Sequence, residues 1–300
     1  MQSGIVTLIG RPNVGKSSLL NALIGRKASI VSHKPQTTRH AIQGVLHRPE
    51  GQVVFVDTPG LHQQARRALN RAMNDAAANS LHDVDLVVFV VESLRWTDED
   101  QAVLERLRGV SAAVALVINK VDRVTDKSRL LPELERLGAL RDFAFIMPLS
   151  ATKGYNVQVL AAEILGRMPE GPPLYPPDMI VGYDNVFLAA ETVREKLTRL
   201  LHKELPYALT VAIESYAVEP LQRGPGEMHR IGAVVWVERE GQKKIVIGED
   251  GGTLKQVGTA ARRELEKLLG GKVFLQLWCR VRDNWSDDPK SLKQFGLSGD

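Results

Sequence analysis

The chain has 300 residues, of which 44% are hydrophobic and 25% charged, a composition that excludes extensive disorder. No apolar run reaches the ~18 residues that a membrane-spanning helix needs, and a single cysteine, Cys279, excludes an intramolecular disulfide framework. The net charge of +4 favours polyanionic partners only weakly. Because the N-terminal residues do not resemble a secretion signal, we expect a soluble cytoplasmic protein of about two domains.

The first half of the chain alternates apolar, β-branched runs with helical patterns, as parallel βαβ units do. Five runs are predicted to be strands: residues 4–10, 53–60, 85–93, 113–122 and 143–151. They are almost continuously apolar, which is expected of strands covered on both faces. The pattern predicts an α/β domain built on a doubly wound, mostly parallel sheet.

A glycine-rich loop follows the first strand and precedes a helical stretch. Residues 10–17 match the P-loop pattern G-x-x-x-x-G-K-[ST] in the context that this motif requires. Backbone N–H groups of such a loop wrap phosphates, Lys16 would reach the β- and γ-phosphates, and the Ser17 hydroxyl would bind Mg²⁺. The alternative is an ordinary turn that happens to carry Lys-Ser. The predicted nucleotide-binding residues of the loop are Gly10, Asn13, Val14, Gly15, Lys16, Ser17 and Ser18.

Two further motifs end the second and fourth predicted strands. In the Asp-Thr-Pro-Gly motif at 57–60, Asp57 can hold Mg²⁺ through water and the Gly60 N–H can meet the γ-phosphate, although a capping turn would look the same. In the Asn-Lys-Val-Asp motif at 119–122, Asp122 can accept two hydrogen bonds from guanine that adenine cannot donate. Asn119 would brace that loop, and Lys120 would cover the base.

Ser150 and Ala151 follow the fifth predicted strand and can offer a backbone N–H to guanine O6. Ligands of doubly wound sheets bind at the carboxyl ends of the strands. Four motifs at that edge, in this order, therefore predict a guanine-nucleotide site. This half of the chain resembles the TRAFAC class of translation-related GTPases.

The resemblance extends to the residues expected to change with nucleotide state. Residues 36–40, Gln-Thr-Thr-Arg-His, would form a switch segment in which Thr38 completes the Mg²⁺ shell, although spacing leaves Thr37 open. Leu61 occupies the place where many GTPases have a water-orienting glutamine, which implies slow unaided hydrolysis. Asn13 matches relatives in which an asparagine helps to bind K⁺. The residues expected to contribute to catalysis are Lys16, Thr38, Gly60 and Asn13.

Five prolines within residues 167–179 predict an extended, fairly stiff linker, which divides the chain into a GTPase domain at 1–173 and a second domain at 180–300. The second half shows, in order, a helical pattern, two strands, a short apolar run, a glycine loop, a helix and a strand. The corresponding residues are 186–205, 207–219, 229–240, 243–248, 248–251, 253–270 and 272–282.

The order helix, strand, strand, glycine loop, helix, strand is that of an α+β type II KH domain. Together with the upstream motifs, it makes the chain from Gly4 to about Phe295 resemble the Era family of bacterial GTPases. The resemblance implies binding of single-stranded RNA near the 3′ end of small-subunit ribosomal RNA and a role in assembly of the small ribosomal subunit. A KH loop clamps about four nucleotides of such RNA.

The Gly-x-x-Gly loop departs from that family pattern. Relatives usually carry a basic residue between the glycines, whereas this chain has Glu249 and Asp250. One carboxylate about 7 Å from a phosphate costs roughly 0.6 kcal/mol in bulk-like water, so the pair is predicted to weaken RNA binding without abolishing it. Alternatively, both carboxylates stabilise the N-terminus of the following helix. The predicted RNA contacts are Gly248, Gly251, Lys243, Lys244, Lys255, Arg262 and Arg280.

Helix geometry places Lys255, Arg262 and Lys267 within one sector and directs Arg263 elsewhere. Two tryptophans are further candidates for stacking on bases, although one of them, Trp278, lies in an apolar strand and is expected to be core. The other is Trp285.

Other functions remain open at this level. One is a GTPase coupled to another task, such as tRNA modification or transport. Another is an RNA-binding module in which nucleotide controls RNA binding and hydrolysis of GTP is negligible. Weak peripheral binding to a membrane is a lesser alternative, suggested by Arg66, Arg67 and Arg71 in the alanine-rich stretch 63–81, which we expect to be a switch-region helix.

Overall fold

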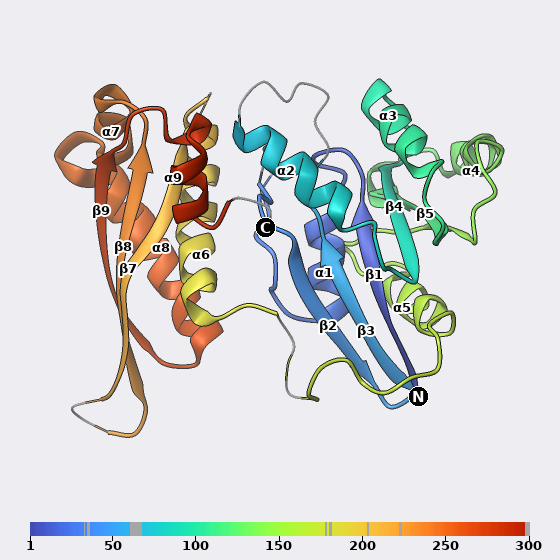
Figure 1. Ribbon diagram of the computed structural model, residues 1–300, viewed down its shortest axis with the longest axis horizontal. Coiled ribbons are helices and arrows are strands. Elements are labelled where there is room, and N and C mark those ends of the chain that lie inside the picture. Colours follow the sequence, from blue (N-terminus) through green and yellow to red (C-terminus); the bar gives the residue numbers. More distant parts are fainter. Residues whose placement is uncertain are drawn as a thin grey trace.

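The computed structural model describes residues 1–32, 34, 37–60, 68–177, 179, 182–202, 204–221 and 224–297. The described chain forms two lobes, each built on its own sheet (Figure 1). None of the helices in these ranges is long and apolar enough to cross a membrane.

The first lobe carries the predicted doubly wound sheet. Its elements are β1 (Gln2–Ile9), α1 (Lys16–Ile24), β2 (Ile42–Arg48), β3 (Gly51–Asp57), α2 (Ala68–Asn79), β4 (Leu86–Glu92), α3 (Asp98–Leu107), β5 (Ala113–Asn119), α4 (Leu130–Gly138), β6 (Ile146–Pro148) and α5 (Val157–Leu165). The strand order is β2-β3-β1-β4-β5-β6, in which β2 pairs antiparallel with β3 and the other neighbouring strands pair parallel. Helices α1 and α5 pack on one face and α2, α3 and α4 on the other.

The five predicted strands are present, and β2 is an addition that the sequence pattern did not indicate. Its residues follow the switch segment directly and form the edge of the sheet, with Gly44 close beneath α1. The P-loop follows β1, which lies between β3 and β4. Chain connections run to opposite sides from that position, which opens a crevice at the carboxyl ends of the strands.

The proline-rich stretch is extended, as expected, but it is bound to the first lobe along its length. Gln52, which is buried in β3, donates to the Tyr175 carbonyl at 2.7 Å and accepts from the N–H groups of Leu174 and Tyr175. Gly182 donates to the Gln43 carbonyl at 3.1 Å. These bonds fix where the second lobe begins relative to the first.

The second lobe is a three-stranded mixed sheet with helices packed on one face. Its elements are α6 (Asn185–Leu200), β7 (Leu209–Pro220), β8 (Glu227–Val237), α7 (Glu240–Ile247), α8 (Gly252–Leu269), β9 (Lys272–Val281) and α9 (Pro289–Gln294). Strand β8 pairs antiparallel with β7 and parallel with β9. Helices α6, α7 and α8 share a core with alternate residues of the strands.

Helix α7 corrects the expectation that residues 243–248 are a short apolar run leading into the loop. The run Ile245-Val246-Ile247 has the β-branched character of a strand, yet it forms the last turn of a helix. Gln242 accepts from the N–H groups of Glu238 and Arg239 and so organises the first turn. Val246 is fully buried while Ile245 is 59% exposed, so one helical face packs on the sheet.

The C-terminal segment joins the two lobes. Trp285 is fully buried, and its indole N–H donates to the Ala208 carbonyl at 3.1 Å. Its ring packs in one cluster with Ala68 and Leu69 of α2, and the Asp287 carboxylate accepts from the Ala68 N–H at 2.8 Å. The hypothesis that Trp285 stacks on RNA bases is therefore wrong, because this side chain holds the lobes together.

Candidate functional site

The two P-loop glycines are required by close approach of neighbouring groups. Gly10 has a φ of 155°, and a Cβ there would lie 2.3 Å from the Val90 carbonyl oxygen. Gly15 has a φ of 102°, and its Cβ would lie 2.3 Å from the Asn119 amide nitrogen. Val14 between them is buried. Only glycine lets the loop turn against β4 and against the Asn-Lys-Val-Asp motif.

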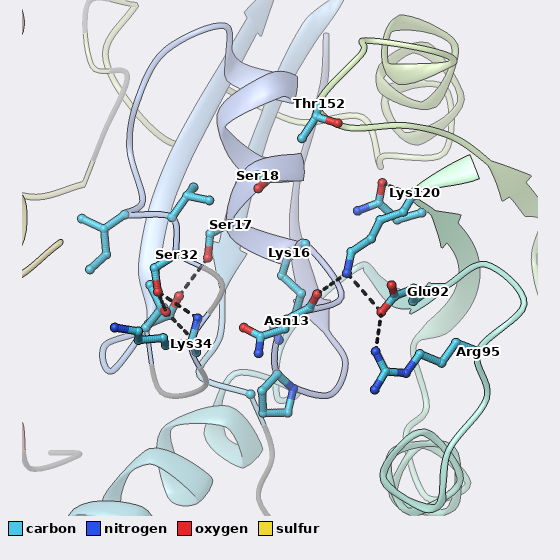
Figure 2. Close-up of a pocket in the computed structure, with 18 of the residues that line it drawn as sticks. Asn13, Lys16, Ser17, Ser18, Ser32, Lys34, Glu92, Arg95, Lys120 and Thr152 are labelled. Atoms are coloured by element: carbon cyan, nitrogen blue, oxygen red, sulfur yellow. Dashed lines mark hydrogen bonds and ion pairs between the residues drawn. The ribbon is translucent and has the colours of Figure 1, made fainter. Parts of the chain in front are cut away.

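Lys16 lies buried at the start of α1. Its Nζ donates to the carbonyls of Gly10 and Arg11 at 2.8 and 3.1 Å, in the centre of the loop (Figure 2). Burial lowers the pKa of Lys16 to about 8, and the charge of Asp57 opposes part of that shift. The negative charge of Asp57 balances the buried ammonium group of Lys16 only in part. Lys16 is therefore suited to bind an anion such as a phosphate.

Three oxygen-bearing side chains meet beside the loop. Ser17 Oγ lies 2.6 Å from Asp57 Oδ2 and 2.8 Å from Thr38 Oγ1, and Thr38 Oγ1 lies 3.5 Å from the same carboxylate oxygen. Thr37 points away, with its hydroxyl bonded to Ser32 and to the Lys34 carbonyl. Of the two threonines that the spacing left open, Thr38 is therefore the one that joins Ser17 and Asp57.

This cluster suits a hard divalent cation. Asp57 is fully buried, and its Oδ1 has no hydrogen-bond partner among the described residues. Burial raises the pKa of Asp57, while Lys16 and the surrounding hydroxyls oppose that shift. Hydroxyl and carboxylate oxygens are the ligand types that Mg²⁺ takes, so Ser17, Thr38 and Asp57 fit this ion.

The side of the site expected to hold the base is braced by Asn119. Its amide donates to the Val14 carbonyl at 2.8 Å and accepts from the N–H groups of Lys120 and Ala151. Asp122 accepts a 2.5 Å bond from the Ser150 hydroxyl. Of the two N–H groups that could face guanine, that of Ser150 donates to the Tyr155 carbonyl at 3.2 Å and that of Ala151 donates to Asn119 at 3.1 Å.

Lys120 connects this motif with the P-loop. Its Nζ donates to the Asn13 carbonyl at 2.7 Å and forms an ion pair with Glu92 at 3.1 Å, as Figure 2 shows. Glu92 also binds Arg11 at 3.1 Å. Glu92 stands at the end of β4 without any recognised motif, so only its place at the carboxyl edge of a strand could have indicated it.

A cavity of about 330 Å³ lies over these groups. The predicted residues that line it are Asn13, Gly15, Lys16, Ser17, Ser18, Thr38, Gly60, Asn119 and Lys120. The remaining predicted residues do not line this cavity: Gly10, Val14, Asp57, Asp122, Ser150 and Ala151. Sequence reasoning missed Ile30, Val31, Ser32, Lys34, Arg95, Arg123 and Thr152.

Gly60 approaches the P-loop closely, since a Cβ on it would lie 2.8 Å from Pro12 atoms. This contact places the Asp-Thr-Pro-Gly motif beside the predicted phosphate site. Residues Gln36, Leu61, Arg66 and Arg67 lie outside the described residues. The remaining arginine of the suggested membrane cluster, Arg71, faces Asp287 at 3.9 Å.

The Gly-x-x-Gly loop connects α7 to α8 in a tight turn. Gly248 and Gly251 both have a φ of 75°, and a Cβ on Gly248 would lie 2.2 Å from the Thr253 hydroxyl oxygen. Asp250 also adopts the left-handed region, with a φ of 48°. Glu249 and Asp250 are exposed, and no side chain caps α8. The expected stabilisation of the α8 N-terminus by Glu249 and Asp250 therefore rests on their charge alone.

The predicted RNA-contacting cations differ in how they are paired. Arg262 binds Glu266 at 3.3 Å, Arg280 binds Glu214 at 2.5 Å, and Lys243 lies 3.9 Å from Glu240. Lys244 is exposed on α7. The paired cations are partly neutralised by neighbours on their own surface.

The expectation that Arg263 is directed away from Lys255 on α8 was wrong. Lys255 and Arg263 line one shallow groove together with Gly252, Gln256 and Thr259, whereas Arg262 turns toward Glu266. Trp278 also differs from the expectation of a core residue, since 42% of it is exposed. It lies on the face of β9 opposite the helices, where it covers Gly232.

Comparisons with known proteins match both lobes. Residues 5–120 match the family model for 50S ribosome-binding GTPases, and residues 204–286 match that for the KH domain. GTPase Era from Stenotrophomonas maltophilia strain R551-3 is 51% identical over 293 residues, which cover 98% of this chain and 96% of the relative. The chain belongs to the Era family.

GTPase Era from Xanthomonas oryzae pv. oryzae strain MAFF 311018 is equally similar, at 51% identity over 295 residues, which cover 98% of this chain and 97% of the relative. Two solved Era structures superpose over 100% of both chains with a TM-score of 0.94 and 37% identity. One is an Aquifex aeolicus Era variant bound to GDP and AlF₄⁻. The other is an Era in complex with MgGDPNP and nucleotides 1506–1542 of 16S ribosomal RNA. The chain is thus a GTPase with a C-terminal KH domain, as its motifs predicted.

Proposed function

We propose that this GTPase binds GTP and GDP with Mg²⁺, binds single-stranded RNA near the 3′ end of small-subunit ribosomal RNA, and assists assembly of the small ribosomal subunit in the cytoplasm. The observation that carries the proposal is the match of both lobes, over the whole chain, to an Era complexed with MgGDPNP and a 3′ fragment of 16S RNA.

In this proposal, Lys16 and the P-loop N–H groups hold the phosphates. Ser17, Thr38 and Asp57 hold the Mg²⁺ ion, which when bound neutralises charge on the β- and γ-phosphates. Asp122 selects guanine, and Asn119 keeps its loop against the P-loop at 2.8 Å from the Val14 carbonyl.

Hydrolysis would rest on Lys16, Thr38 and Gly60, with Gly60 offering its N–H to the γ-phosphate. Asn13 stands at the rim of the cavity with its carbonyl bound by Lys120. We infer that its amide helps to bind a K⁺ ion that supplies positive charge in the transition state. Leu61 provides no side chain that could orient water, so we expect slow hydrolysis without an activator.

The RNA site would be the Gly248–Gly251 loop, whose glycines allow the two backbones to approach closely. Lys244 and Lys255 flank this loop and are exposed. Lys243, Arg262 and Arg280 would have to exchange a carboxylate partner for a phosphate, so we expect them to contribute less.

The experiment that tests the proposal measures binding of a single-stranded RNA copying the 3′ end of small-subunit ribosomal RNA. Apo, GDP-bound and GTP-analogue-bound protein are compared at two salt concentrations, with a scrambled RNA and a tRNA as controls. Tight, sequence-selective binding that is strongest with the analogue supports the proposal. Equal and purely salt-dependent binding of every RNA would contradict it, and preference for tRNA would favour a role in tRNA modification.

A further inference from the structure

The segment that carries Thr38 is held by the second lobe rather than by the first alone. Arg194 of α6 donates from Nη2 to the carbonyl of Thr37, the residue before Thr38. The same guanidinium binds both carboxylate oxygens of Glu191, at 2.6 and 2.7 Å. Arg194 and Glu191 are 2% and 6% exposed, so this contact is shielded from water. Figure 1 shows α6 on the side of the second lobe that faces the first.

The residue after Thr38 is anchored in the second lobe as well. Arg39 is 3% exposed, and its guanidinium donates to the carbonyls of Leu209, Pro206 and Tyr207 at 2.7, 3.0 and 3.3 Å. These carbonyls belong to the turn that opens β7. The residues before and after Thr38, Thr37 and Arg39, are therefore both held by hydrogen bonds with the second lobe.

The segment before Thr38 makes further contacts with α6. Lys34 Nζ donates to the Thr198 carbonyl at 2.5 Å, near the C-terminal end of that helix. The Val31 N–H donates to Glu195 at 3.0 Å, and Arg199 donates to the Val31 carbonyl at 2.8 Å. These contacts hold the segment to α6. Among the described contacts between the lobes, those of Arg194 and Arg39 involve the residues next to Thr38.

A hydroxyl group binds a metal ion well when the backbone that carries it is held in the right position. Thr38 Oγ1 lies 2.8 Å from Ser17 Oγ, and the second lobe holds the Thr37 carbonyl before it and the Arg39 side chain after it. We propose that Arg194, oriented by Glu191, is a positioning residue for the GTPase reaction: it holds the Thr37 carbonyl so that the Thr38 hydroxyl faces the Mg²⁺ site. This inference rests on the proposed role of Thr38 as a ligand to that ion.

A positioning role of Arg194 and a purely structural role predict different effects on nucleotide binding. In GTPases the switch segment is ordered by γ-phosphate and Mg²⁺ contacts and released after hydrolysis. Loss of the Arg194 contact should therefore weaken binding of a non-hydrolysable GTP analogue and leave GDP binding unchanged. A residue that only stabilised the fold would affect both nucleotides alike.

The variant for this test replaces both members of the buried pair. Removing Arg194 alone would leave Glu191 buried without its hydrogen-bonded counter-charge, whereas apolar replacement of a whole ion pair is often neutral for stability. In Glu191→Leu/Arg194→Met, we expect the ratio of the analogue Kd to the GDP Kd to rise about tenfold, as for loss of one charge-assisted hydrogen bond. The Mg²⁺ concentration that half-saturates analogue binding should rise with it.

Two comparisons complete the test. Arg199→Ala is the matched control, because it removes a contact from the same helix to Val31 and should leave the ratio unchanged. Thr38→Ala should raise the ratio by itself, and adding the double substitution to it should have no further effect, since both changes remove the same interaction.

Equal weakening of both nucleotides, or an unchanged ratio in a folded double variant, would overturn the positioning role. An additive effect in the Thr38→Ala background would overturn it too, because Arg194 would then act through another group. If Thr38→Ala leaves the ratio unchanged, the role of Thr38 as ligand is wrong, and the inference fails with it. The two failures are thus distinguishable.

Discussion

Ser17 Oγ and Thr38 Oγ1 lie 2.8 Å apart although they belong to different elements, one at the start of α1 and the other before β2. Both face Asp57 at the end of β3, whose second carboxylate oxygen has no partner among the described residues. Because Thr38 belongs to the switch segment and Ser17 to α1, this distance depends on the position of the switch segment.

Replacement of Thr38 by alanine is expected to lower kcat for GTP hydrolysis roughly 100-fold, the usual effect of losing one group that stabilises charge in the transition state. Steady-state GTPase assays across a range of Mg²⁺ concentrations would measure this. Thr37→Val is the matched control, because among the described residues the Thr37 hydroxyl bonds to Ser32 and Lys34 and not to the Ser17–Asp57 cluster. A larger loss in Thr37→Val than in Thr38→Ala would reverse the assignment of the two threonines.

The lowered pKa of Lys16, about 8, predicts proton uptake when nucleotide binds at alkaline pH. Phosphate raises the pKa of the bound lysine, so at pH 8.5 the mostly neutral group must gain a proton, whereas at pH 7 it is already charged. GDP affinity should therefore fall as pH rises above about 8. Calorimetric titration with GDP in two buffers of different ionisation enthalpy measures the uptake. No difference between the buffers at pH 8.5 would contradict the prediction.

The proposed K⁺ site predicts faster GTP hydrolysis in KCl than in NaCl at the same ionic strength. Asn13 has a φ of 65°, so Asn13→Gly removes the amide and keeps the backbone conformation. This variant should hydrolyse GTP at one rate in both salts. Equal rates for the unchanged protein would show that its Asn13 does not recruit K⁺.

The acidic pair in the KH loop is expected to weaken RNA binding. Replacing Glu249 and Asp250 with lysine should tighten binding several-fold at low salt, by removing repulsion and adding attraction. Glu249→Gln/Asp250→Asn is the neutral comparison, and asparagine tolerates the left-handed backbone that Asp250 adopts. Its gain should be smaller, about the 1 kcal/mol or less of removed repulsion. No gain in either variant would mean that both carboxylates point away from the RNA backbone.

Arg263 and Arg262 offer a matched pair on α8. Arg263 shares a groove with Lys255 beside the KH loop, whereas Arg262 is paired with Glu266. If RNA follows that groove, Arg263→Gln should reduce the slope of log K against log salt by about 0.7, the value for one phosphate contact in a single strand. Arg262→Gln should change it much less. Titrations of the 3′ RNA at several salt concentrations would decide between them.

Local pattern was sufficient for the framework of both lobes. The strands of the first lobe are nearly continuous apolar runs, and each nucleotide motif stands directly after one of them, so Lys16, Asp57 and Asn119 could be placed at one sheet edge from sequence order. The Gly248–Gly251 loop was also recognisable from the sequence, because its turn needs a positive φ at two positions and glycine occupies both.

Short elements and long side chains were less predictable. Helix α7 was missed because its apolar residues, Ile245 to Ile247, have strand propensity, and only packing on the sheet makes them helical. The neighbouring cations Arg262 and Arg263 were harder to place, because the position of Arg263 beside Lys255 and the pairing of Arg262 with Glu266 depend on side-chain conformation.

The sequence by itself indicated which chemistry to expect: sites for phosphate, magnesium and guanine at the end of one sheet, and a loop for clamping an RNA backbone in a second domain. Only the tertiary structure decided that Thr38, rather than Thr37, meets Ser17 and Asp57, and that Arg194 and Arg39 hold the peptide on either side of it. Motifs are local and can be read from spacing. Arg194 and the carbonyls that bind Arg39 lie more than 150 residues further along the chain, and only packing of the two lobes brings them to Thr38.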